Sequence, residues 1–371
     1  MKRRYGWIII ALLMLFAAVG CVRRPLEDLY RNSIKVVIKC VWEVRAYPEG
    51  LKPDGVTMYF FKDGKYFNSI TTPNVDSCEV QLPAGHYKMF MISQSPEEYW
   101  KMEFDNMTSY QEAEATLRET ASAAWASRAD GSVVVENPEV MCAGVSDEFD
   151  ITTEMTEDYQ YYYTNLRSIR SRSSKGTKSD ISEEEKMYEE MVEYRTVRIP
   201  VYPQNIVSQF WVTIYAGNAD VLKSVRASTS GMARSWELTQ GVTGSNKAIQ
   251  IINQWTLDMD DASRRVGHVD GIITTFGLPN GEQPSAMRDS TLNVSALLID
   301  NSTVADYTFS VGDKIQVLPP NPGYHGLYRL VFGSVENPMI VLPDVKPVQG
   351  GGGFTVGVED WDDEIEADIV L

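Results

Sequence analysis

Short segments in which apolar and polar residues alternate run through most of this 371-residue chain, and they constrain its fold more than any other feature. Residues 34–44 carry apolar side chains at every second position, which is the period of a half-buried strand. Residues 56–61 and 66–70 flank Lys62-Asp63-Gly64-Lys65, where Asp-Gly supplies the positive φ angles of a hairpin turn. The pattern predicts a fold built from strands.

Three further predictions concern the first half of the chain. Residues 78–82 and 86–92 predict a second hairpin around Pro83-Ala84-Gly85. Trp42 falls on the apolar side of the first strand, which predicts a position in the core. Residues 108–128 are rich in Ala and Glu, and Thr108 with Gln111 fits a capping box, so we expect one helix there.

Residues 159–193 interrupt the strand pattern. Basic residues stand among serines in 166–179, which predicts a mobile loop, and the acidic residues 180–190 predict a short helix or more loop. We interpret the whole stretch as a linker between two domains. The basic residues of the loop are Arg167, Arg170, Arg172, Lys175 and Lys178.

Strands dominate again from residue 195 onward, with Gly, Pro and Asn between them, which predicts a β-sandwich. Parallel βαβ units are absent from the pattern, which argues against the usual nucleotide-binding architectures. We therefore expect an all-β protein with a minor helical insertion and two β-sandwich domains, residues 34–158 and 194–371. The candidate strands of the second domain are 197–201, 210–214, 221–227, 248–255, 271–276, 292–299, 307–311, 327–332 and 354–358.

The N-terminus has the layout of a bacterial lipoprotein signal. Residues 2–4 are basic, residues 7–18 are apolar, and Ala18-Val19-Gly20-Cys21 places small residues before a cysteine. We expect residues 1–20 to be a signal peptide, Cys21 to carry the lipid, and residues 21–33 to form a tether. An ordinary signal peptide with a chance cysteine is the alternative. The apolar run of about twelve residues is shorter than the roughly 20 that a membrane span needs.

Net charge excludes several classes of partner. The chain carries −17, and removal of residues 1–20, which hold three basic and no acidic side chains, leaves −20. Such an acidic chain is unsuited to nucleic acid and to anionic lipid, so membrane attachment must come from the acyl chains on Cys21. The expected location is the outer membrane, with the face of the membrane undecided.

Sequence motifs for catalysis or cofactor binding are missing. The chain has no P-loop, GxGxxG, GxSxG or HExxH motif, and we expect no cofactor and no metal. His86, His268 and His325 lie far apart in the sequence and suggest neither a catalytic base nor, with the cysteines, a metal site. After Cys21 only Cys40, Cys78 and Cys142 remain, without CxxC spacing. The sequence therefore leaves undecided whether two of them form a disulfide.

Several short segments, taken in order, resemble one family. They are the lipobox at Cys21, Leu82-Pro83-Ala84-Gly85-His86-Tyr87, Ser230-Gly231-Met232-Ala233, Thr275-Phe276-Gly277, and the ending from Gly352 to Trp361. Together they resemble the fimbrillin-like lipoproteins of Bacteroidota, in particular a family of unknown function near the fimbrial anchor and minor fimbrial subunit lipoproteins of type V pili. The resemblance implies two transthyretin-like β-sandwich domains, outer-membrane attachment and roles in fimbriae or adhesion. It implies no catalytic residue.

Alternative functions remain open at this stage. In the favoured one, the chain keeps its lipid and its first strand and acts as an anchor, minor subunit or adhesion component, with fimbrial subunits as partners through strand addition. Cleavage after Arg45, which follows the first strand, would instead give a polymerising pilin. A carbohydrate-binding lipoprotein of a glycan uptake system, with exposed rings such as Tyr161-Tyr162-Tyr163, is the competing class. A hydrolase with an unrecognised pair of carboxylates comes third.

Overall fold

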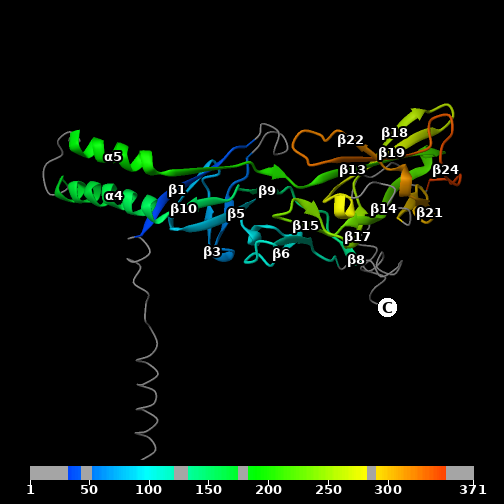
Figure 1. Ribbon diagram of the computed structural model, residues 1–371. Helices are drawn as coiled ribbons and strands as arrows, with labels where there is room; N and C mark the ends of the chain where they lie inside the picture. The colour runs from blue at the N-terminus through cyan, green and yellow to red at the C-terminus, as the bar shows by residue number, and fades with distance from the viewer. Residues whose placement is uncertain (1–31, 43–51, 121–132, 174–182, 282–289, 348–371) are drawn as a thin grey trace, which may run out of the picture. The chain divides into compact units, whose positions relative to one another are not determined.

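A computed structural model describes residues 32–42, 52–120, 133–173, 183–281 and 290–347. In these ranges the chain forms five β-sheets and two α-helices (Figure 1), which confirms the expected all-β fold class. The described residues divide by their contacts into two compact units. The first comprises 32–38, 78–87, 148–173 and 183–199, and the second comprises 39–42, 52–77, 88–120, 133–147, 200–281 and 290–347.

A three-stranded sheet lies mainly in the first unit and contains the first predicted strand. Its order is β11-β1-β4, so β1 is hydrogen-bonded on both sides. Ile34, Val36 and Ile38 of β1 are fully buried, as the alternation in the sequence predicts. The strands are β1 (Ser33–Cys40), β4 (Ser77–Pro83) and β11 (Val197–Val201).

Two helices of the first unit, α4 (Thr153–Ser173) and α5 (Glu183–Arg195), lie side by side (Figure 1). The guanidinium of Arg170 donates to Glu185 and to Glu189, each at 3.0 Å. The predicted loop is therefore wrong for the part of it that lies in α4, where Arg170 finds acidic partners on α5. The acidic helix is confirmed by α5, and residues 174–182 lie outside the described ranges.

The predicted hairpin around Pro83-Ala84-Gly85 does not form. Strand β5 (Gly85–Ser93) belongs to a different sheet from β4, and its first residues pair with β10 (Phe149–Ile151). Only Ala84 separates β4 from β5. Two antiparallel neighbours need a loop of about two residues or more, so a one-residue connection carries the chain from one sheet into another.

The other predicted hairpin is confirmed in the second unit. Strands β2 (Val56–Lys62) and β3 (Lys65–Thr72) pair around Asp63 and Gly64, whose φ angles are 50° and 77°. Two consecutive positive φ angles make the tight turn that matches strand twist. The sheet runs β12-β9-β5-β2-β3, with β9 (Cys142–Val145) and β12 (Gln204–Asn205) at one side.

A four-stranded sheet replaces the helix predicted over residues 108–128. Glu114–Leu117 forms strand β7 and pairs with β6 and β15, while residues 121–128 lie outside the described ranges. Ala115 and Leu117 are buried at alternate positions, so burial in a sheet outweighs the helix propensity of Ala and Glu. The order is β16-β15-β7-β6, with β6 (Met102–Asp105), β15 (Ser235–Glu237) and β16 (Val242–Thr243).

Two larger sheets form the β-sandwich predicted for the second half. One runs β21-β20-β14-β17-β8, and the other runs β18-β19-β13-β23-β22 with β24 beside β13. The first contains β8 (Val133–Val135), β14 (Leu222–Ala233), β17 (Lys247–Ile252), β20 (Thr291–Leu298) and β21 (Val304–Ser310). The second contains β13 (Ser208–Gly217), β18 (Trp255–Asp261), β19 (Val266–Thr275), β22 (Gln316–Leu318), β23 (Leu327–Phe332) and β24 (Ile340–Val341). The strand predicted at 354–358 lies outside the described ranges.

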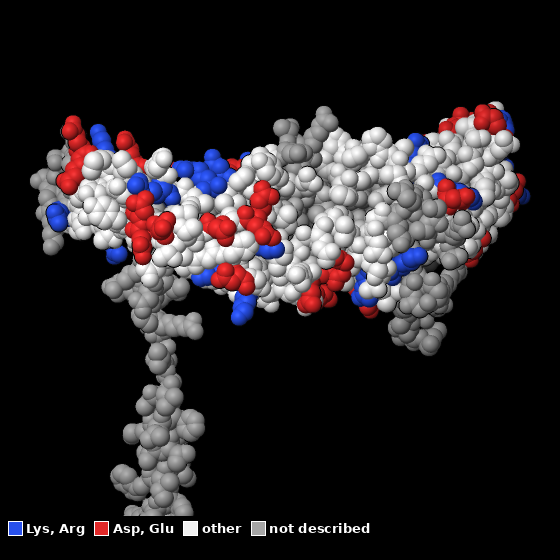
Figure 2. All heavy atoms as spheres, viewed as in Figure 1, with Lys and Arg blue, Asp and Glu red and all other residues white. Residues whose placement is uncertain are grey.

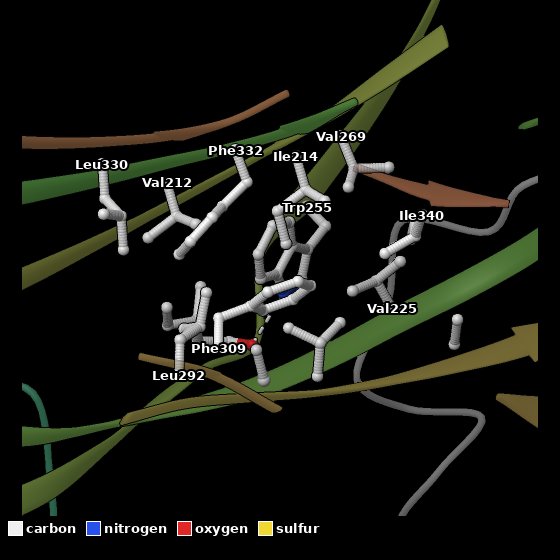
Figure 3. Close-up of a cluster of buried hydrophobic side chains, with 14 of the residues drawn as sticks. Val212, Ile214, Val225, Trp255, Val269, Leu292, Phe309, Leu330, Phe332 and Ile340 are labelled. Atoms are coloured by element: carbon white, nitrogen blue, oxygen red, sulfur yellow. Dashed lines mark hydrogen bonds between the residues drawn. The ribbon is translucent and has the colours of Figure 1, made fainter. Parts of the chain in front are cut away.

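Charged side chains of both signs are interspersed over the described surface in one view of the molecule (Figure 2). In the interior, apolar side chains from the two large sheets meet in one buried cluster (Figure 3). Val212 and Leu330 approach it from one sheet, and Leu292 from the other. The indole N–H of Trp255 donates to the Ile252 carbonyl at 2.8 Å, so its polar atom is satisfied inside the cluster.

Trp42 does not lie in the core as predicted. It is half-buried, because β1 ends at Cys40, and its indole N–H donates to the Val75 carbonyl at 2.8 Å.

Two strands from the stretch assigned to the N-terminal domain pair with strands of the second half. β7 pairs with β15, and β8 pairs with β17. The domain boundaries at 158 and 194 stay a prediction.

Candidate functional site

The two site residues predicted from the sequence, Cys21 and Arg45, lie outside the described ranges. The structure gives the surroundings of the strand between them, since β1 occupies Ser33–Cys40. None of the helices it describes is long and apolar enough to cross a membrane. Lipidation at Cys21 and cleavage after Arg45 therefore stay predictions.

The cysteines that the structure describes form no disulfide. Cys40, Cys78 and Cys142 are all buried, and the structure joins no two of them. Burial raises the pKa of the Cys142 thiol far above its ordinary value. A buried thiol of this kind is unreactive and serves as a small apolar side chain.

His86 stands on the surface between two carboxylates. Its Nδ1 lies 2.8 Å from Asp150 Oδ1 and its Nε2 lies 3.0 Å from Glu148 Oε2. The hydrogen bond to Asp150 is the main reason that the pKa of His86 is raised, and Glu148 adds to it. Position, charge and exposure together indicate a surface ion-pair network.

His268 lies among three aspartates on strands β18 and β19. Its Nδ1 is 2.8 Å from Asp260 Oδ2, and its Nε2 is 3.5 Å from Asp270 Oδ2 and 3.9 Å from Asp258 Oδ2. Partial burial lowers the pKa of His268, but Asp260 and the two other carboxylates raise it above the ordinary value. Within the described part of the chain, no three His, Cys, Asp or Glu side chains are arranged to hold a metal ion.

His325 belongs instead to a hollow of about 340 Å³ in the second unit. We call it the Tyr202 hollow. Its floor is apolar and includes Trp236, which is 4% exposed, and its rim carries Tyr202, which is 57% exposed. The lining residues are Ala143, Gly144, Val145, Tyr202, Gln204, Asn205, Ile206, Trp236, Leu238, Thr239, Gln240, Gly241 and His325.

Hydrogen bonds fix the segments that form the Tyr202 hollow. The Asn205 side chain donates to the Gly323 carbonyl and accepts from the Val207 amide, and the His325 amide donates to the Val207 carbonyl at 2.8 Å. The loop after β15 is held by the Gly241 amide, which donates to the Glu237 carbonyl at 2.9 Å. The hollow is thus built into the fold, as small-molecule sites usually are.

None of the described residues that line the Tyr202 hollow carries a carboxylate, ammonium or guanidinium group. Desolvation by the surrounding atoms lowers the pKa of His325, although the residue as a whole is exposed. The lowered pKa favours the neutral ring at pH 7. It stands edge-on to Trp236, with 5.0 Å between ring centroids and 78° between planes.

Sequence reasoning missed this hollow. Tyr202, Trp236 and His325 come from three distant segments, and no spacing or motif connects them. The exposed aromatics that the sequence did suggest, in Tyr161-Tyr162-Tyr163, lie on α4, and Tyr161 is 60% exposed. They stand on a convex helix, whereas the hollow combines aromatic and amide side chains in a concavity.

Comparison with known protein families assigns the chain to one family. Residues 20–253 match a family described as a domain of unknown function, DUF5119. The chain belongs to this family. The match covers well over half of the chain, and DUF5119 carries no assigned activity that could be transferred. No curated protein sequence matches the chain significantly.

Several solved structures are similar to this chain. A candidate adhesin from Bacteroides ovatus matches with 17% identity and a TM-score of 0.50, over 89% of this chain and 99% of that one. The fimbrial anchor protein Mfa2 from Porphyromonas gingivalis matches with 14% identity and a TM-score of 0.45, over 81% and 90%. A second candidate adhesin from Bacteroides ovatus matches with 11% identity and a TM-score of 0.44, over 88% and 93%. At these identities the likeness is one of fold alone.

Proposed function

We propose that this protein is a lipid-anchored surface protein of the outer membrane that acts in adhesion or in attaching fimbriae, without enzymatic activity. The observation that carries the proposal is the fold, which is shared over 89% of this chain and 99% of a Bacteroides ovatus candidate adhesin. A lipobox at Cys21 supplies the means of attachment. Fimbrial subunits are the expected partners, through strand addition.

The lipid on Cys21 has to hold the protein with little help from charge. A single acyl chain binds membranes only marginally, and a basic patch is the usual second signal. The mature chain carries −20, and basic and acidic side chains are interspersed over the surface that Figure 2 shows. Stable anchoring therefore requires the complete set of acyl chains on Cys21.

The position of β1 supports an anchor over a polymerising pilin. Cleavage after Arg45 would remove β1, which lies between β11 and β4 and contributes Ile34, Val36 and Ile38 to the buried interior. Loss of a central strand leaves two strands without a partner and exposes apolar surface, unlike loss of an edge strand. In the favoured form, Cys21 stays joined to this strand.

The N-terminus and intact mass of the native protein, purified from its membrane, test the proposal. An acylated Cys21 with the complete chain behind it is the expected result. A chain beginning at Ala46 in sheared fimbriae would make the protein a pilin. An unacylated chain that dissolves without detergent would end the lipoprotein proposal. Proteinase treatment of intact cells, with cell-free membranes as the control, reports which face carries the protein.

One observation favours carbohydrate binding as a second candidate function. The Tyr202 hollow joins an exposed tyrosine ring to amide side chains, and its described lining contains no carboxylate, ammonium or guanidinium group. Adhesion to a glycan and anchoring by a lipid are compatible, since one uses the folded chain and the other its N-terminus.

A further inference from the structure

We infer that the Tyr202 hollow binds a neutral carbohydrate of about one or two sugar rings. The inference rests on the proposed adhesion function for its biological setting, whereas the binding itself is a property of the purified chain. Its volume of about 340 Å³ lies at the lower end of the range of ligand sites, which run from roughly 300 to 1,000 Å³.

The described lining of the Tyr202 hollow carries little charge for so acidic a chain. The chain has 51 acidic and 34 basic residues, yet among the described residues that line the hollow only Tyr202 and His325 carry ionisable side chains. Desolvation lowers the pKa of His325, which favours the neutral form of its ring at pH 7. A charged ligand would lose its hydration without gaining a partner, so the hollow selects a neutral one.

The lining combines the two chemistries that a sugar ring needs. Tyr202 offers an exposed aromatic ring, onto which the C–H face of a pyranose can pack. Gln204 and Gln240 are exposed and belong to the same hollow, and their amides both donate and accept hydrogen bonds. Hydroxyl groups along the edge of a sugar match such amides, since each hydroxyl also donates and accepts.

An unsatisfied donor lies in the floor. The indole N–H of Trp236 is buried and has no acceptor among the residues that the structure describes. Leaving a buried donor without a partner destabilises the fold, because the donor has lost its water without gaining an acceptor. Trp236 lines the hollow with His325 edge-on against its ring, so a ligand in the hollow lies against the residue whose N–H lacks an acceptor. A neutral polyhydroxylated ligand supplies that acceptor without bringing a charge.

The chain contains its own reporter for the test. It has three histidines, and of these only His325 lines the hollow. We would titrate the full mature chain with lactose, mannobiose and chitobiose, and follow the histidine ring protons by NMR. One of these neutral disaccharides is expected to shift the His325 signal in a saturable manner and to leave those of His86 and His268 in place. Sialic acid and glucuronic acid are expected to shift none.

Two variants and a matched control locate the binding. Tyr202→Ala and Gln240→Ala are each expected to weaken the disaccharide about tenfold or more, while Tyr161→Ala, another exposed tyrosine, leaves it unchanged. Both altered side chains are exposed, so an unchanged melting temperature serves as the fold control. The inference is overturned if no neutral sugar shifts His325, if both variants bind as the parent does, or if neutral peptides alone shift it. None of these outcomes alters the mass of the native N-terminus, so the proposed function is tested separately.

Discussion

Phe90 shows how much one aromatic side chain contributes to the second unit. It is fully buried, with its ring stacked on Tyr59 at 4.8 Å and on Phe61 at 5.8 Å between centroids. Phe90→Ala removes these contacts and leaves a cavity, so we expect a loss of about 3–5 kcal/mol in the free energy of unfolding. Urea denaturation measures it, with Trp100→Ala, at an 81%-exposed position, expected to stay within about 0.5 kcal/mol.

The three histidines differ in pKa for reasons that lie in their contacts. Carboxylates raise the pKa of His86 and His268, and desolvation lowers that of His325. Histidine titration by NMR should therefore give two values above about 6.5 and one below it, assigned with His→Gln variants. A pKa of His325 above the pKa values of His86 and His268 would contradict the proposal that the His325 ring is neutral at the Tyr202 hollow.

Stability should follow these pKa values with opposite signs. A raised pKa stabilises the fold below the unfolded value of about 6.5, and the gain is lost as pH rises through the folded pKa. The free energy that His268→Gln removes should thus be larger at pH 5.5 than at pH 8.5. His325→Gln should behave in the opposite way, because a lowered pKa stabilises the fold above about 6.5 only. Equal effects at both pH values would show that neither histidine changes its pKa on folding.

Strand β1 is the element that connects the membrane anchor to the fold. A chain that begins at Ala46 lacks its three buried apolar side chains, each of which contributes about 1.5–3 kcal/mol. We expect that chain to melt at a lower temperature than the mature protein. A peptide of residues 33–42, added in trans, should raise the melting temperature, whereas a scrambled peptide should not. An unchanged melting temperature after truncation would show that β1 is dispensable and would favour the pilin.

At the scale of the whole molecule, strands from the first half complete sheets of the second. β7 pairs with β15, and β8 pairs in parallel with β17. A fragment of residues 194–371 lacks both strands, so we expect it to bind hydrophobic dyes and to melt without a cooperative transition. Co-expression with residues 22–193 should restore the transition. If the fragment alone melts in a cooperative transition, residues 194–371 form an independent domain with the predicted boundary at 194.

The sequence predicted local elements well where a single segment determines the structure. Alternation from Ile34 onward gave β1, and Asp63-Gly64 gave the β2–β3 turn, because strand period and backbone sterics are properties of neighbouring residues. The prediction failed where the structure of a segment depends on the strand with which it pairs. Residues 114–117 favour a helix by composition but pair with β6 and β15, and β4 and β5 are neighbours in sequence but belong to different sheets.

By itself, then, the sequence determined the all-β class, the acidic charge and the family resemblance, since these follow from period, composition and short motifs. It also carries the lipobox at Cys21, whose use remains to be measured. The tertiary structure alone decided the partners of β7 and β8 and the surroundings of each histidine. It alone formed the Tyr202 hollow, because Tyr202, Trp236 and His325 converge only when strands and loops far apart in the chain are fixed by long-range hydrogen bonds.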